Sequence, residues 1–211
     1  MAYIEMKHSY KRYQTGDTEI IANNDINFAI EKGELVIILG SSGAGKSTVL
    51  NILGGMDNND EGQVIIDGVD IANYSQKELT TYSRNDVGFV FQFYNLVPNL
   101  TAKENVELAS EIVADARDAE QTLIDVGLGK RLNNFPAQLS GGEQQRVLIG
   151  NSLLSDKKIF IFDEPASGLD YEHMLAVGKL LQELKAAGKI VLVITHDKEL
   201  VTTVCDYQRD F

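Results

Sequence analysis

The sequence has 211 residues, which is enough for one large α/β domain or for a core with a subdomain. Its formal net charge of −12 argues against DNA or RNA as the main partner, because a nucleic-acid-binding protein usually carries a basic stripe and none is visible. The single cysteine, Cys205, excludes an internal disulfide and fits a reducing compartment.

The sequence shows no targeting or membrane-spanning segment. Residues 1–13 contain no apolar signal core, and no apolar run approaches the roughly 20 residues of a membrane helix. We therefore expect a cytoplasmic protein, or one on the cytosolic face of a membrane whose spanning part is another chain.

Sequence patterns in the first third of the chain predict mostly strands. Alternating patterns predict short strands at residues 3–9, 19–22 and 26–30, and the apolar run LVIIL predicts a buried strand at residues 35–39. A helix at 47–53, a strand at 62–67, a helix at 75–85 and a buried strand at 87–91 follow. Ser75 and Glu78 have the spacing of a capping box.

The middle of the chain changes to helical patterns, and the α/β alternation then returns. Helices are expected at residues 101–113, at 115–126 and from 142 onward. A strand at 158–162, a helix at 171–186 and a strand at 190–194 follow. We expect an α/β core formed by residues 1–93 and 146–211, with a mainly parallel sheet and an N-terminal antiparallel part, and an inserted helical subdomain at 94–145.

A phosphate-binding loop lies between the strand at 35–39 and the helix after it. Its sequence GSSGAGKST satisfies the pattern G-x-x-x-x-G-K-[ST] in a strand–loop–helix setting. The loop consists of Gly40, Ser41, Ser42, Gly43, Ala44, Gly45, Lys46, Ser47 and Thr48. Glycines allow backbone N–H groups to converge on phosphates, while the lysine ammonium adds charge and the Ser47 hydroxyl can ligate Mg²⁺. A plain glycine-rich turn is the alternative, and we favour a nucleoside triphosphate site.

Polar residues follow three further predicted strands. We expect them at the same crevice as the phosphate-binding loop, because ligands of parallel sheets bind at the carboxyl ends of the strands. Asp163 would hold Mg²⁺, and Glu164 would orient or deprotonate an attacking water, although a solvated carboxylate pair is the alternative. His196 ends another buried strand, where a γ-phosphate would lie, but a lone histidine is more often structural. Gln92 could reach Mg²⁺ or the water, and a polar residue that merely ends a strand is equally plausible.

A second anion site is predicted at LSGGEQQR, residues 139–146. Ser140 and Glu143 have capping-box spacing, which by itself indicates only the start of a helix. Two glycines directly after the cap expose N–H groups at the helix N-terminus. If the two phosphate-binding surfaces cannot meet within one molecule, they must meet between two.

Taken together, these motifs resemble the ATP-binding subunit of an ABC transporter. The motifs GSSGAGKST, Gln92, LSGGEQQR, IFIFDEP, SGLD and ITHD occur in the order found in that family. The resemblance implies ATP and Mg²⁺ as ligands, with Ser47, Gln92 and Asp163 at the metal. It implies catalytic roles for Glu164, His196, Lys46 and Gln92, and adenine stacking on Tyr13.

The resemblance also implies partners. Two subunits, most simply identical, would sandwich two ATP molecules, with Ser140, Gly141 and Gly142 binding the γ-phosphate held by the other subunit and Asp170 at the D-loop position. Closure would be transmitted through the helical insertion to a membrane permease, and no nucleic acid is expected. A soluble ABC-type ATPase acting on DNA, ribosomes or cofactor assembly, and an engineered nucleotide-binding scaffold, are the alternatives.

Two branches of the family are represented. The first half is similar to ATPases of macrolide export and lipoprotein release, and the later part to energy-coupling-factor systems. A recombined or engineered chain, with its seam between Ala109 and Ser155, is one hypothesis. Gly150 departs from the family pattern, and glycine inside a helix costs about 1 kcal/mol of propensity.

Overall fold

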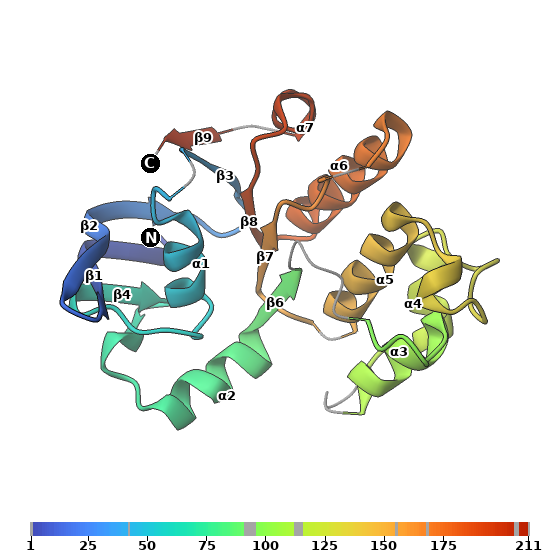
Figure 1. The fold of residues 1–211 in the computed structure, drawn as a ribbon, viewed down its shortest axis with the longest axis horizontal. Coiled ribbons are helices and arrows are strands. Elements are labelled where there is room, and N and C mark those ends of the chain that lie inside the picture. The colour runs from blue at the N-terminus through green and yellow to red at the C-terminus, as the bar shows by residue number, and fades with distance from the viewer. Residues whose placement is uncertain are drawn as a thin grey trace.

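The computed structural model describes residues 2–41, 43–90, 96–111, 116–154, 156–167 and 169–204, and the backbone of 207–210. Figure 1 shows an antiparallel sheet with α1 at one end of the molecule and the helices α3, α4 and α5 at the other. A parallel sheet lies between these two ends. The expected α/β class, with its antiparallel part and helical region, is confirmed.

The antiparallel sheet contains, in spatial order, β2 (Thr18–Ile30), β1 (Ile4–Thr15), β4 (Glu61–Ile66) and β5 (Val69–Asp70). The prediction of three short strands before residue 31 is wrong, because β1 and β2 form one long hairpin. Bulges interrupt the alternation without ending the pairing, and His8 and Asp25 take positive φ at these interruptions.

The parallel sheet contains, in spatial order, β6 (Val87–Val90), β7 (Ile159–Asp163), β8 (Ile190–Ile194), β3 (Leu35–Leu39) and β9 (Tyr207–Asp210). Alternate side chains of β3 enter two different cores: Leu35 and Ile37 one, Val36 and Ile38 the other. A strand covered on both faces must be apolar throughout, which explains why apolar runs correctly predicted β3, β7 and β8.

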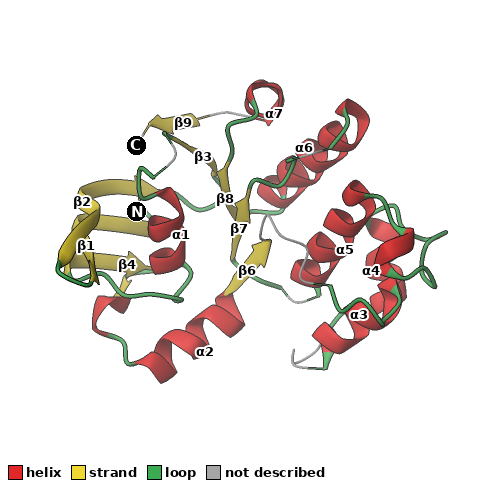
Figure 2. Cartoon of the chain, viewed as in Figure 1, coloured by secondary structure: helices red, strands yellow, loops and turns green. Residues whose placement is uncertain are grey.

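The helices are α1 (Lys46–Leu53), α2 (Gln76–Asp86), α3 (Ala102–Ser110), α4 (Ala119–Asp125), α5 (Gly141–Leu153), α6 (Tyr171–Ala186) and α7 (Lys198–Val204). Short 3₁₀ turns, η1 (Ile71–Asn73) and η2 (Pro136–Gln138), complete the helical segments of the described chain, and Figure 2 shows all strands and helices by type. The predicted bounds of α6 are confirmed. The sequence predicts a helix over residues 116–118, but these residues are not helical. The Asp118 carboxylate accepts the N–H of Gln121 and caps α4 there.

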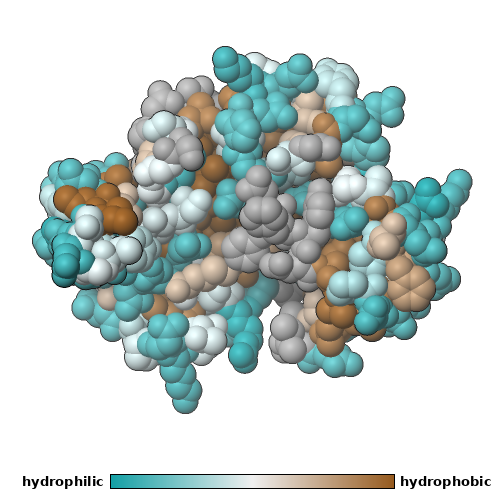
Figure 3. Space-filling view, in the orientation of Figure 1, coloured by the Kyte–Doolittle hydropathy of each residue, from teal (hydrophilic) through white to brown (hydrophobic). Residues whose placement is uncertain are grey.

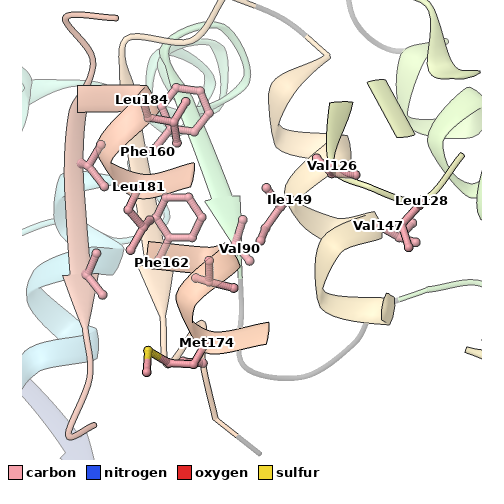
Figure 4. Close-up of a cluster of buried hydrophobic side chains, with 14 of the residues drawn as sticks. Val90, Val126, Leu128, Val147, Ile149, Phe160, Phe162, Met174, Leu181 and Leu184 are labelled. Atoms are coloured by element: carbon pink, nitrogen blue, oxygen red, sulfur yellow. The ribbon is translucent and has the colours of Figure 1, made fainter. Parts of the chain in front are cut away.

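One hydrophobic core joins the helical region to the parallel sheet. Phe160 and Phe162 of β7 belong to a buried cluster with Leu181 of α6 and Ile149 of α5, as Figure 4 shows. Residues of α3 and α4 belong to the same cluster. The other core joins residues of α1 and α2 to residues of both sheets. The subdomain boundaries at 93/94 and 145/146 stay a prediction.

Candidate nucleotide site

A pocket of about 720 Å³ opens where the loop after β3, the carboxyl ends of β7 and β8, and the β1–β2 hairpin meet. Its lining includes most of the predicted phosphate-binding and catalytic residues. These are Tyr13, Gly40, Gly43, Ala44, Gly45, Lys46, Ser47, Thr48, Asp163, Glu164 and His196. Ser42 and Gln92 lie outside the described residues.

The phosphate loop places Gly45 where a side chain would not fit. Gly45 has φ +80° at the N-cap of α1, and a Cβ there would lie 2.0 Å from the Ala22 carbonyl oxygen of β2. Gly45 has no side chain with which to cap α1, so the first N–H groups of the helix meet no acceptor from their own N-cap residue. The Lys46 Nζ donates to the carbonyl oxygens of Gly40 and Ser41, both at 2.8 Å. The loop thus gathers a cation and orphan donors at one end of the pocket.

Glu164 is fixed by both its backbone and its side chain. Its φ of +52° lies in the left-handed region, which a glutamate rarely adopts, and its N–H donates to the Ile194 carbonyl. The carboxylate has Oε1 2.6 Å from His196 Nδ1, and Oε2 accepts from Thr195 Oγ1 at 3.2 Å. Glu164 is largely buried, whereas the His196 side chain is 83% exposed.

The Thr195 contact was not predicted from the sequence. Its only signal is a hydroxyl directly after the apolar strand β8, next to the predicted His196. Thr195 and His196 together hold the carboxylate of Glu164 in one orientation at the edge of the pocket.

Asp163 sits beside Glu164 at the end of β7. Burial raises the pKa of Asp163, the neighbouring Glu164 raises it further, and Lys46 opposes the change. A half-buried carboxylate whose charge is disfavoured gains most from a cation. Asp163 and Ser47 line the same pocket, and a carboxylate and a hydroxyl are hard oxygen donors of the kind Mg²⁺ uses together with phosphates. The residues present therefore fit Mg²⁺.

The apolar side of the pocket is formed by the β1–β2 hairpin. Tyr13 and Ile20 are cross-strand partners, and both line the pocket together with Ile21. Ile20 and Ile21 are half exposed, and Figure 3 shows an apolar patch where this hairpin lies. The isoleucines carry no chemical motif, and sequence reasoning missed them.

The residues of LSGG do not line this pocket. Ser140 caps α5: its hydroxyl accepts from the Glu143 N–H at 3.2 Å, and the Glu143 carboxylate accepts from the Ser140 N–H at 2.8 Å. The predicted capping box is confirmed. Gly141 begins α5, which lies across the parallel sheet from α1 (Figure 1).

Asp170 lies near LSGG rather than in the pocket. It caps α6 and accepts from the His173 N–H at 2.9 Å, with the His173 ring nitrogen 2.6 Å from the same oxygen. A Cβ on Gly142 would lie 3.2 Å from the His173 ring. The chain thus presents two separate groups, one around Lys46 and one around Ser140.

Known proteins share this arrangement of sequence and fold. The ABC transporter family model matches residues 23–167. An uncharacterized ABC transporter ATP-binding protein of Methanocaldococcus jannaschii is 43% identical over 204 residues, covering 93% of this chain and 90% of its own. The macrolide export ATP-binding/permease protein MacB of Shewanella sp. is 39% identical over 93% of this chain, which spans only 31% of that protein.

Solved structures of ATP-binding cassettes also resemble this chain. A dimeric ATP-binding cassette in a post-hydrolysis state, bound to ADP and Pi, matches with a TM-score of 0.86 and 38% identity, over 95% of this chain and 91% of that one. Among the described residues, no helix has the length and apolar character needed to cross a membrane. The macrolide-export relative of Shewanella sp. aligns with 93% of this chain, which includes both halves. The hypothesis that the chain is recombined stays a prediction. By sequence and by fold, the chain belongs to the ABC transporter family of ATP-binding proteins.

Proposed function

We propose that the chain binds ATP with Mg²⁺, hydrolyses it, and powers a membrane transporter as one of two ATP-binding subunits. The observation that carries this proposal is the convergence of Lys46, Asp163 and Glu164 on one pocket at the N-terminus of α1. The ATPase part also agrees with the relatives, one of which is solved with ADP and Pi.

Each residue has a role set by its chemistry. Lys46 and the N–H groups of the loop bind the phosphates. Glu164 accepts a proton from the water that attacks the γ-phosphorus, while the bond from phosphorus to the ADP oxygen breaks. His196 and Thr195 keep the carboxylate of Glu164 oriented.

Mg²⁺ would be held by Asp163 and Ser47, with Gln92 as a further ligand or a water-orienting group. Bound there, it would neutralise charge on the phosphate oxygens. Tyr13 would stack on the adenine ring.

The second subunit supplies what this pocket lacks. Ser140, Gly141 and Gly142 lie outside the pocket of their own chain, so they would bind the γ-phosphate held by a second copy, with Asp170 at the same interface. The solved relatives include dimers, which supports this arrangement. Gln92 and residues 94–145 would transmit closure to a permease on the cytosolic face of a membrane, as the ATP-binding/permease name of the MacB relatives suggests.

The test is Mg-ATP hydrolysis measured against protein concentration for the wild type and for Glu164→Gln. We expect a wild-type rate that rises faster than linearly, and a loss of about a hundredfold or more in Glu164→Gln with ATP binding retained. Glu172→Gln, an exposed glutamate in the first turn of α6, is the matched control and should keep the wild-type rate. A background rate in the wild type would contradict hydrolysis, and a strictly linear one would contradict the shared site. Co-purification with nucleic acid rather than a membrane protein would favour the soluble alternative.

A further inference from the structure

The aromatic ring of Tyr13 is held in place by a residue far away in the sequence. The Tyr13 hydroxyl donates to Asp57 Oδ2 at 2.7 Å, across 44 residues of chain. The other carboxylate oxygen, Oδ1, accepts from Lys11 Nζ and from the Asn58 N–H, both at 2.8 Å. One carboxylate therefore ties two side chains of β1 to the loop after α1.

Lys11 completes the arrangement. It is buried to 9% exposure, and its ammonium also donates to the Asn58 carbonyl at 2.7 Å. The same ammonium lies 5.2 Å from the centroid of the Tyr13 ring. Since Lys11 occupies one side of the ring, a planar ligand would use the other.

Asp57 is a carboxylate that stays charged and can therefore always accept the hydrogen bond from Tyr13. Burial favours its neutral form, yet the hydrogen bonds from Lys11, Tyr13 and the Asn58 backbone hold the pKa of Asp57 below its ordinary value. The carboxylate thus stays charged at neutral pH, and a charged acceptor makes the stronger hydrogen bond.

Asp57 is also fixed to the helix that follows the phosphate loop. The N–H groups of Met56 and Asp57 both donate to the Asn51 carbonyl in the last turns of α1. The ring of Tyr13, which lines the pocket, is therefore tied through Asp57 to the helix that begins with Lys46.

We propose that Asp57, supported by Lys11, is a positioning residue that fixes the Tyr13 ring for stacking against the base of a bound nucleotide. This inference rests on the proposed function, because it requires a nucleotide in the pocket. A purely structural role is the competing explanation, in which the ion pair only fastens β1 to the loop after α1.

The two explanations differ for a ligand that has no base. We would measure the affinities of Mg-ADP and Mg-pyrophosphate by calorimetry for the wild type, Asp57→Ala, Asp57→Asn and Tyr13→Phe, with the unfolding temperature of each. Tyr13→Phe keeps the ring and removes the hydroxyl that Asp57 holds. Asp60→Asn is the matched control, because Asp60 also lies near Lys11 (3.6 Å) and accepts the Arg12 N–H, without touching Tyr13.

We expect Asp57→Ala and Tyr13→Phe each to weaken Mg-ADP binding about three- to tenfold and to leave Mg-pyrophosphate binding unchanged. The double variant should be no weaker than either single one, because both remove the same restraint. Asp60→Asn should keep the ratio of the two affinities. Asp57→Asn, which retains an acceptor, should lose less than Asp57→Ala and covers the case in which the alanine variant does not fold.

Equal losses for both ligands, or no loss for either, would overturn the positioning role while leaving the nucleotide site intact. A wild-type chain that binds neither ligand would overturn the proposed function itself.

Discussion

The two helices predicted to bind phosphate begin in opposite ways. The N-cap residue of α1 is Gly45, whose φ is +80° and which has no side chain for capping. The first helical residue of α1 is Lys46. α5 starts at Ser140 with a complete capping box to Glu143, whose carboxylate also accepts from Arg131 Nε at 2.8 Å. The first N–H groups of α1 stay uncapped beside the pocket. The capping box of α5 satisfies part of the N–H groups of that helix, and the residues of this box lie outside the pocket.

The difference separates two kinds of anion site. The pocket at α1 combines open N–H groups, a lysine and strand-end carboxylates from one chain, so a single chain can bind phosphate there. α5 is stable as a helix start without any ligand, and it contributes only a hydroxyl and glycine N–H groups. In the proposed dimer, α5 would meet the phosphate held by a second copy, and the following variants test this comparison.

Gly45→Ala should have the largest effect on stability. A Cβ would collide with the Ala22 carbonyl oxygen at 2.0 Å and would also force φ +80° on alanine, so we expect a loss of about 3 kcal/mol in the free energy of unfolding. Urea unfolding measures it. Gly43→Ala is the matched control: its φ of +81° imposes the same strain, but nothing lies within 4 Å of the new Cβ. Equal losses would show that the packing of α1 against β2 does not matter.

Lys46→Ala should abolish nucleotide binding while the fold survives. Loss of the charged donor should weaken Mg-ATP binding about a hundredfold or more, as measured by calorimetry. Lys179→Ala, on the exposed face of α6 with a side chain 79% exposed, should bind as the wild type does. Unchanged ATP affinity in Lys46→Ala would refute the assignment of the site.

Ser140→Ala should separate the two helix starts. We expect ATP binding by the single chain to be unchanged and turnover to fall about tenfold, because the hydroxyl would act only on the phosphate of a second copy. Ser75→Ala removes an equivalent capping box on α2 and is the control. Both variants should lose about 1 kcal/mol of stability, and only Ser140→Ala should lose turnover. Equal turnover in the two would argue against a role for α5 at phosphate.

Gly150→Ala should have the smallest effect, and a stabilising one. Gly150 lies within α5, and its Cβ would contact Thr122 at 3.6 Å, an ordinary van der Waals distance. The gain in helix propensity should raise the free energy of unfolding by about 1 kcal/mol. Gly142→Ala, at the other end of α5, would press 3.2 Å against the His173 ring and should not stabilise. A destabilised Gly150→Ala would show that α5 has no room there.

Local patterns predicted the parts of the molecule that depend on local physics. The phosphate loop, the capping boxes and the buried strands β3, β7 and β8 follow from spacing and from burial on both faces. The long hairpin was missed because bulges break the alternation that marks a strand. β5, β9 and α7 were missed because they are short and, unlike β3, β7 and β8, contain no continuous apolar run.

Contacts between distant residues could not be predicted in the same way. Lys11 and Asp57 are 46 residues apart, and neither stands in a motif. Thr195 gains its importance only because β7 and β8 pair in a register that brings it to Glu164. Such contacts depend on the assembled sheets, which a single sequence does not specify residue by residue.

The backbone of Glu164 has a consequence for how this protein could be changed. A glutamate held at φ +52° costs of order 1–3 kcal/mol relative to a residue that prefers this conformation. A laboratory selection for heat resistance alone would therefore favour Glu164→Gly, which relaxes the backbone and removes the carboxylate. Thermostable variants of this chain would need to be screened for turnover at every round, because this substitution removes the carboxylate to which the proposed function assigns the proton transfer.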